Sequence, residues 1–196
     1  MNDQILWFAT RGAGIVSLLL LTAVVGLGVL TAVRFQRPAW PRFLTAGLHR
    51  NLALLSVAFL GVHVATAVLD PFASLGLVAA AIPFASSYRP LWVGLGVIAF
   101  DLFLALVLSS LLRARLGARA WRAIHWLAYA CWPLALLHGV GAGSDATAPW
   151  MLALDVACVA LVAGALAWRL AGLRSPRAEL TEVVHRRAIV ETGRGA

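Results

Sequence analysis

The chain alternates between long apolar runs and short polar segments. Five runs are long enough to cross the hydrocarbon of a bilayer, which takes roughly 20 apolar residues in a helix. They cover residues 12–33, 45–69, 91–112, 120–140 and 149–168. The pattern predicts an all-α integral membrane protein, a bundle of about five transmembrane helices.

Residues 71–88 are also apolar, but Pro71 and Pro83 bracket most of this stretch, and Ser86 and Ser87 follow. A stretch of this kind favours an interfacial or re-entrant loop over a complete span. A sixth transmembrane helix is the alternative.

The arginines predict how the bundle is oriented. Fourteen of the 16 basic residues lie between the first two helices, between the third and fourth, or after the fifth. By the positive-inside rule these three segments face the cytoplasm, so the N-terminus lies outside and the C-terminus inside. We expect a membrane domain over residues 1–172 and a cytoplasmic polar tail over 173–196. The first residues lack the pattern of a signal peptide, so we expect no cleaved leader.

Composition supports the membrane assignment. Hydrophobic residues make up 62% of the 196 residues, charged residues 12%, and the mean hydropathy is +0.88. A soluble, disordered or disulfide-rich protein does not have this composition. The net charge of +8 lies between apolar runs rather than on one basic face, so we expect no nucleic-acid partner. Cys131 and Cys158 lie within apolar runs and predict no disulfide.

Four of the five histidines fall within predicted membrane helices, where ionisable side chains are rare and suggest a function. His49 and His63 stand 14 residues apart on the second helix, roughly 21 Å, and project from one face. His125 and His138 stand 13 apart on the fourth, about 19.5 Å. The fifth, His185, lies in the polar tail.

Because these two helices run in the same direction, His49 is level with His125 near the inner surface, and His63 with His138 near the outer one. Two imidazoles at one level are the ligand set of a six-coordinate haem iron. The spacing therefore predicts two b haems stacked across the bilayer. Zinc needs three or four converging ligands, and each level offers two.

The 13-residue spacing conflicts with a straight fourth helix, because 13 steps end about 140° short of four full turns. Pro133 lies between the two histidines and removes a helical hydrogen bond. We expect a kink or a tightened turn there to bring both rings to one side.

Two histidine pairs spaced 14 and 13, on helices flanking one intervening helix, resemble the ferric reductase-like transmembrane domain. This superfamily includes the NADPH oxidases, the ferric reductases and the haem-binding subunit of periplasmic methionine sulfoxide reductase. The segment Leu116-Gly117-Ala118-Arg119-Ala120-Trp121-Arg122-Ala123-Ile124-His125-Trp126-Leu127-Ala128-Tyr129 is similar to its entry into the second ligand helix. The resemblance covers about residues 6–170.

The resemblance implies inner-haem ligands His49 and His125, and outer-haem ligands His63 and His138. It also implies electron flow from the cytoplasmic haem to the outer one and then to an external acceptor. Arg11 is similar to an arginine that contacts outer-haem propionates; a snorkelling interfacial arginine is the alternative. Arg50 and Arg122 adjoin the inner pair and are further candidates for propionate contacts, although the positive-inside rule already explains them.

The chain also departs from this family. Fewer than 30 residues follow Trp168, too few for flavin and nicotinamide domains, and five helices are predicted where many relatives have six. We therefore expect the haem-bearing membrane component of an oxidoreductase in the cell membrane, reduced by a cytoplasmic flavin reductase or a membrane quinol. Ferric iron, oxygen and a periplasmic reductase are the candidate acceptors. The rival interpretation is a non-redox scaffold or transporter subunit with structural histidines.

Two acidic residues lie within predicted spans, Asp101 in the third and Asp155 in the fifth. Either is a candidate for proton movement or an ion pair with an arginine. An interhelical hydrogen bond is the alternative.

Overall fold

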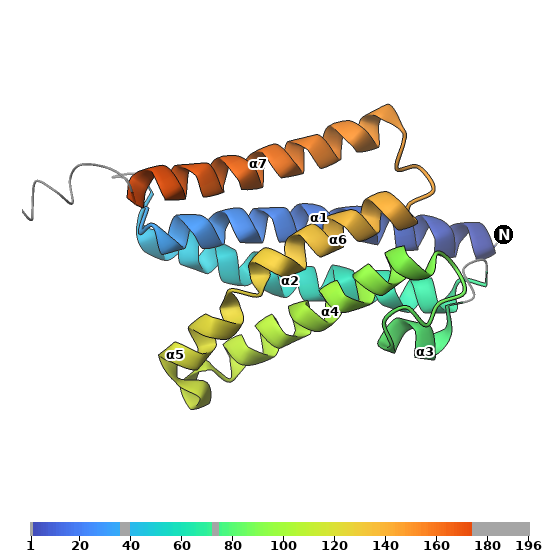
Figure 1. Ribbon diagram of the computed structural model, residues 1–196, viewed down its shortest axis with the longest axis horizontal. Helices are drawn as coiled ribbons and strands as arrows, with labels where there is room; N and C mark the ends of the chain where they lie inside the picture. The colour runs from blue at the N-terminus through green and yellow to red at the C-terminus, as the bar shows by residue number, and fades with distance from the viewer. Residues whose placement is uncertain (1, 36–39, 72–74, 174–196) are drawn as a thin grey trace, which may run out of the picture.

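The computed structural model describes residues 2–35, 40–71 and 75–173, and these residues contain seven α-helices (Figure 1). The helices are α1 (Asn2–Ala32), α2 (Arg42–Leu69), α3 (Gly76–Ala81), α4 (Pro90–Leu111), α5 (Arg113–His125), α6 (Ala128–Ala142) and α7 (Pro149–Leu173). Helices α1, α2, α4 and α7 are each long and apolar enough to cross a membrane, and α5 with α6 forms a fifth, bent span. The predicted all-α membrane bundle is confirmed.

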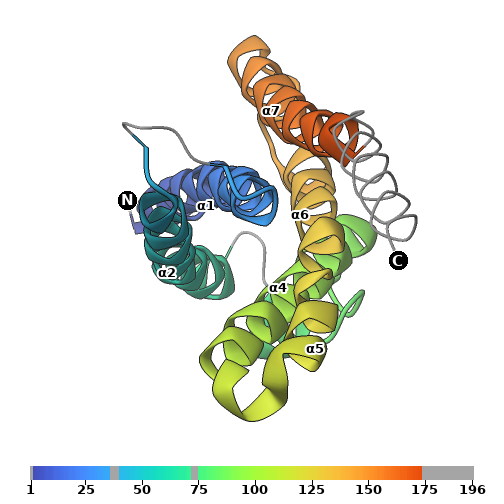
Figure 2. The same ribbon diagram turned by 90° about the vertical axis from the view of Figure 1, so that its left-hand side faces the viewer.

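The spans pack as two helix pairs and one further helix. Helix α1 lies along α2, and α4 lies along α6, as the view down the bundle shows (Figure 2). Helix α7 packs against α1. One core cluster joins α1, α6 and α7 through Leu18, Val25, Trp132, Cys158 and Val162. A second joins α4 to α6 through Phe103, Leu106 and Cys131. Both cysteines are free, as predicted.

Particular residues set where the helices begin and turn. Helix α4 starts at Pro90, directly after Arg89, whose φ of 42° lies in the left-handed region. Proline suits the first helical position because its missing N–H would have no helical partner there. Gly117 has a φ of 76° and interrupts α5 with a kink, a conformation that glycine adopts at little cost.

Three of the predicted spans differ from the helices observed. The first helix begins at Asn2 rather than at residue 12, so Arg11 lies inside α1. The fourth was predicted as one helix over 120–140 but is divided into α5 and α6. The fifth continues to Leu173. The tail predicted over 173–196 lies almost entirely outside the described residues.

The apolar stretch 71–88 does not form a spanning helix in the part that the structure describes. It contains only the six-residue helix α3, which rises about 9 Å. A turn follows in which the Ser86 hydroxyl donates to the Tyr88 carbonyl at 2.9 Å. This agrees with the predicted interfacial or re-entrant loop, and the alternative of a sixth transmembrane helix is wrong.

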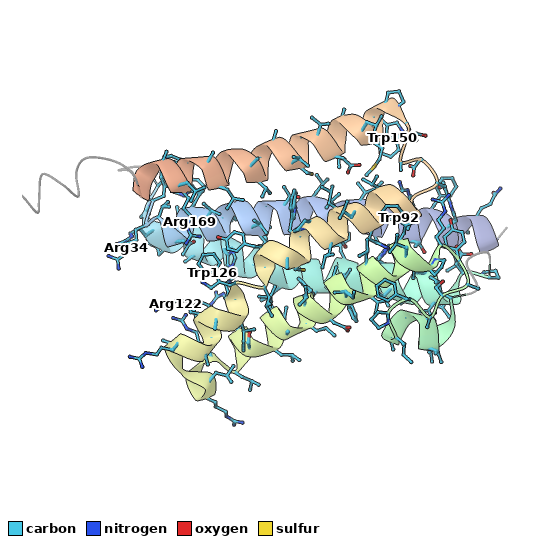
Figure 3. All side chains as sticks on the ribbon, viewed as in Figure 1. Arg34, Trp92, Arg122, Trp126, Trp150 and Arg169 are labelled. Atoms are coloured by element: carbon cyan, nitrogen blue, oxygen red, sulfur yellow. The ribbon has the colours of Figure 1, made fainter. Side chains whose placement is uncertain are left out.

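Arginines from separate polar segments lie at one end of the bundle. Arg34, Arg122 and Arg169 are found at the left in Figure 3, and Trp92 and Trp150 at the opposite end. This arrangement is the one that the positive-inside prediction requires, with the arginine-bearing end facing the cytoplasm.

Candidate functional site

The four membrane histidines form two pairs. His49 in α2 faces His125, the last residue of α5, with ring centroids 6.1 Å apart. His63, further along α2, faces His138 in α6, also at 6.1 Å. The 14 residues between the two α2 histidines separate the pairs by roughly 21 Å. The structure thus brings the histidines together in the two combinations expected from their spacing.

The separation within each pair suits one metal ion between the rings. Two imidazoles that bind a metal from opposite sides, through bonds of about 2.0 Å, have centroids about 6 Å apart. Among the described residues, no three metal-ligating side chains converge. Each level therefore offers two protein ligands, which are the two His–His pairs.

Backbone carbonyls orient three of the four rings. A carbonyl oxygen only accepts, so the Nδ1 atom of each of these rings is the donor. The Nε2 atom then carries the lone pair and is free to bind a metal. The acceptors are the carbonyls of Val24 for His49 (2.9 Å), Thr10 for His63 (2.8 Å) and Trp92 for His138 (2.9 Å). His125 is the exception, since its buried Nδ1 has no partner within the described residues.

A break in the second ligand helix resolves the conflict posed by its 13-residue spacing. Helices α5 and α6 meet at an angle of 47°. Amides just after His125 bond three residues back rather than four, as in Leu127 N–H to Ile124 O at 2.9 Å. Such turns advance about 120° per residue instead of 100°. The helix is therefore not straight, as expected, but the predicted position of its kink was wrong: Pro133 lies inside α6.

A largely apolar cavity extends from the outer histidine pair into the bundle. Its walls come from α1, α2, α4 and α6, the α3 region and the loop after α6, and include both His63 and His138. Ser56, Phe103 and Cys131 line its deeper part. The two histidines of the inner pair are not among its lining residues.

Arg11 lines the outer end of this cavity together with the outer histidines. Its guanidinium forms an ion pair with Asp145, in the segment between α6 and α7. The pair joins α1 to that segment and places a cation beside the outer histidine level. The other two candidate arginines, Arg50 and Arg122, are exposed, and Figure 3 shows Arg122 on α5 at the arginine-rich end.

An aromatic stack beside the inner pair was not foreseen from the sequence. The Trp121 ring is stacked on His125, with centroids 4.8 Å apart and planes at 29°. The guanidinium of Arg113 lies 4.2 Å from the centroid of Trp121. Trp121 and His125 are four residues apart, a spacing that places two side chains on one helix face, so this signal was available.

The two acidic residues in the spans have different surroundings. Asp101 is exposed on the outside of the protein bundle. Asp155 is 7% exposed, and neither of its carboxylate oxygens has a hydrogen-bond partner within the described residues. The alternative of an interhelical hydrogen bond is therefore not seen for Asp155.

Comparison with known proteins was made at the level of families, curated proteins and solved structures. The family model described as "Ferric reductase like transmembrane component" matches residues 13–141, about two thirds of the chain. The matched region includes all four membrane histidines and extends from α1 to α6. No curated protein and no solved structure matches the chain. Transmembrane electron transfer is the function that the match indicates, and the chain belongs to the family of ferric reductase-like transmembrane components.

Proposed function

We propose that this protein is a di-haem b cytochrome that carries electrons from a cytoplasmic donor to an acceptor on the other side of the membrane. The observation that carries the proposal is the presence of two His–His pairs with equal centroid separations of 6.1 Å, on two levels of one bundle. Within each pair the rings are too far apart to be hydrogen-bonded to each other, and an iron between them accounts for the distance.

The residues around each pair suit haem. Three of the rings use Nδ1–H on a backbone carbonyl and leave Nε2 for iron. The cavity beside His63 and His138 has mostly apolar walls, as a porphyrin face requires. Arg11 lies at that cavity and offers a guanidinium, which suits a propionate. When bound, haem supplies one-electron redox chemistry, and the protein supplies ligation, spacing and electrostatics.

The side chains between the two levels exclude water from the path. Leu21, Leu60 and Phe103 line the cavity between the outer pair and the middle of the bundle. Leu106 and Cys131 continue the packed core toward the inner pair, with Cys131 only 1% exposed. A dry, closely packed interior has a low dielectric and keeps both ligand levels in fixed positions.

The ends of the bundle suggest where donor and acceptor meet the protein. We assign the donor, a flavin reductase or a membrane quinol, to the arginine-rich end near His49 and His125. The acceptor, which is ferric iron, oxygen or a periplasmic reductase, belongs at the opposite end near His63 and His138. The Arg11–Asp145 ion pair lies at this acceptor end.

The test is purification from cells supplied with haem. We expect a red protein with about two haems per chain and a low-spin bis-histidine spectrum after dithionite reduction. His63→Ala or His138→Ala should remove mainly the outer haem, and His49→Ala or His125→Ala the inner one. His185→Ala, the remaining histidine, is the matched control and should keep both. A colourless wild-type protein would refute the proposal and favour a non-redox scaffold or transporter subunit.

A further inference from the structure

Each backbone acceptor of a histidine lies four residues before a glycine. The three acceptor–glycine pairs are Thr10 with Gly14, Val24 with Gly28, and Trp92 with Gly96. In an α-helix the carbonyl of one residue points toward the amide of the residue four positions later. A ring that approaches this carbonyl from the side must therefore lie against that later residue.

The space that these glycines leave is filled by the imidazoles. A Cβ atom at Gly96 would lie 2.5 Å from Nδ1 of His138, and one at Gly14 would lie 2.9 Å from Nδ1 of His63. A Cβ at Gly28 would lie 3.3 Å from Cε1 of His49. At all three positions the nearest atoms belong to the histidine ring. Any larger residue would push the ring away from its carbonyl acceptor.

We infer that Gly14, Gly28 and Gly96 are positioning residues for the metal-binding histidines, an inference that rests on the proposed haem ligation. Each glycine lets an imidazole approach the neighbouring helix closely enough to donate its Nδ1–H. That hydrogen bond fixes the ring and directs Nε2, and it makes the ligand more basic. Three of the four ligands are held this way.

The register of the helices explains why the arrangement repeats. Gly14 and Gly28 are 14 residues apart on α1, the same interval as the two histidines on antiparallel α2. On α4, counting 13 residues onward from Gly96, the interval between His138 and His125, reaches Ser109, not a glycine. The break after α5 intervenes, and the His125 ring is stacked on Trp121 instead. The inner haem is therefore held by one carbonyl-braced ligand and one stacked ligand.

The experiment compares Gly→Ala variants of the full chain, expressed with haem and purified. Haem content and the spin state of each haem in the oxidised protein are measured. We expect Gly96→Ala and Gly14→Ala to lower retention of the outer haem about 10-fold or to convert it to a high-spin form. Gly28→Ala should change only the inner haem, and less, because the contact is longer. The control is Gly12→Ala, since a Cβ there meets no atom within 4 Å. Two unchanged low-spin haems in Gly96→Ala would overturn the inference.

A double substitution separates ring positioning from helix packing. If Gly96 acts through His138, adding Gly96→Ala to His138→Ala should cause no further loss of the inner haem or of thermal stability. A further loss as large as in the wild-type background would overturn the inference. If the wild-type protein held no haem, the proposed function would fail, but the same comparison by melting temperature would still test the glycine contacts.

Discussion

Replacing Trp132 by Phe removes an indole N–H that joins α6 to α1 inside the bundle. Trp132 is 8% exposed, and its Nε1–H donates to the Thr22 hydroxyl at 2.9 Å. That hydroxyl in turn donates to the Leu18 carbonyl at 2.7 Å. Interhelical hydrogen bonds in membrane proteins contribute about 0.6 kcal/mol on average and up to about 1.7 kcal/mol. Since this bond is buried and well formed, we expect about 1 kcal/mol, a factor of about 5 in the folding equilibrium.

The measurement is a double-mutant cycle with Trp132→Phe, Thr22→Val and both together, by equilibrium unfolding in mixed micelles. Thr22→Val should cost about 1–3 kcal/mol, because it leaves the buried indole N–H without an acceptor. The double variant should recover about 1 kcal/mol of the summed cost of the single ones. Trp150→Phe, at a tryptophan that is 53% exposed, is the control and should change stability by less than about 0.5 kcal/mol. A coupling energy below about 0.3 kcal/mol would show that packing alone joins these helices.

Three further changes test other parts of the site. Arg11→Gln should lower the midpoint potential of the outer haem and Asp145→Asn should raise it, because a nearby cation favours the reduced state; shifts of the same sign in a redox titration would contradict this. Gly117→Ala should cost about 1–2 kcal/mol in micelle unfolding, because its φ of 76° strains any residue with a Cβ, whereas Gly47→Ala, with no atom within 4 Å of the added Cβ, should not. Trp121→Leu should speed dissociation of the inner haem, measured by transfer to apomyoglobin, and Trp121→Phe should restore the wild-type rate, since a ring can still stack; equal rates would exclude a role for the stack.

Hydropathy predicted the spans closely where lipid imposes them. In hydrocarbon every backbone amide and carbonyl must bond within the segment, so an apolar run of sufficient length has to be helical. The third span, predicted over 91–112, is observed as α4 over Pro90–Leu111. The start of α1 could not be predicted in this way. Its first turns contain Asp3 and Arg11, and a helix extends past a membrane surface without any apolar signal.

The break in the second ligand helix shows a different limit. Proline is the usual sequence sign of a kink, and Pro133 was the candidate. The helix instead breaks at Trp126 and Leu127, neither of which is a helix breaker, and Pro133 is accommodated inside α6. Local propensity cannot locate such a break, because the packing of α6 against α4 determines where the turn must tighten.

The sequence by itself determined the number of spans, the end of the bundle that carries the arginines and the levels of the four histidines. These properties follow from hydropathy, charge and the rise of a helix, which are local or additive along the chain. Only the tertiary structure decided which ring meets which carbonyl, that His125 has a tryptophan stack in place of a carbonyl brace, and that Arg11 pairs with Asp145. A helical repeat gives the height and direction of a side chain, but what that side chain meets depends on the register of a neighbouring helix, which is set by close packing between the two.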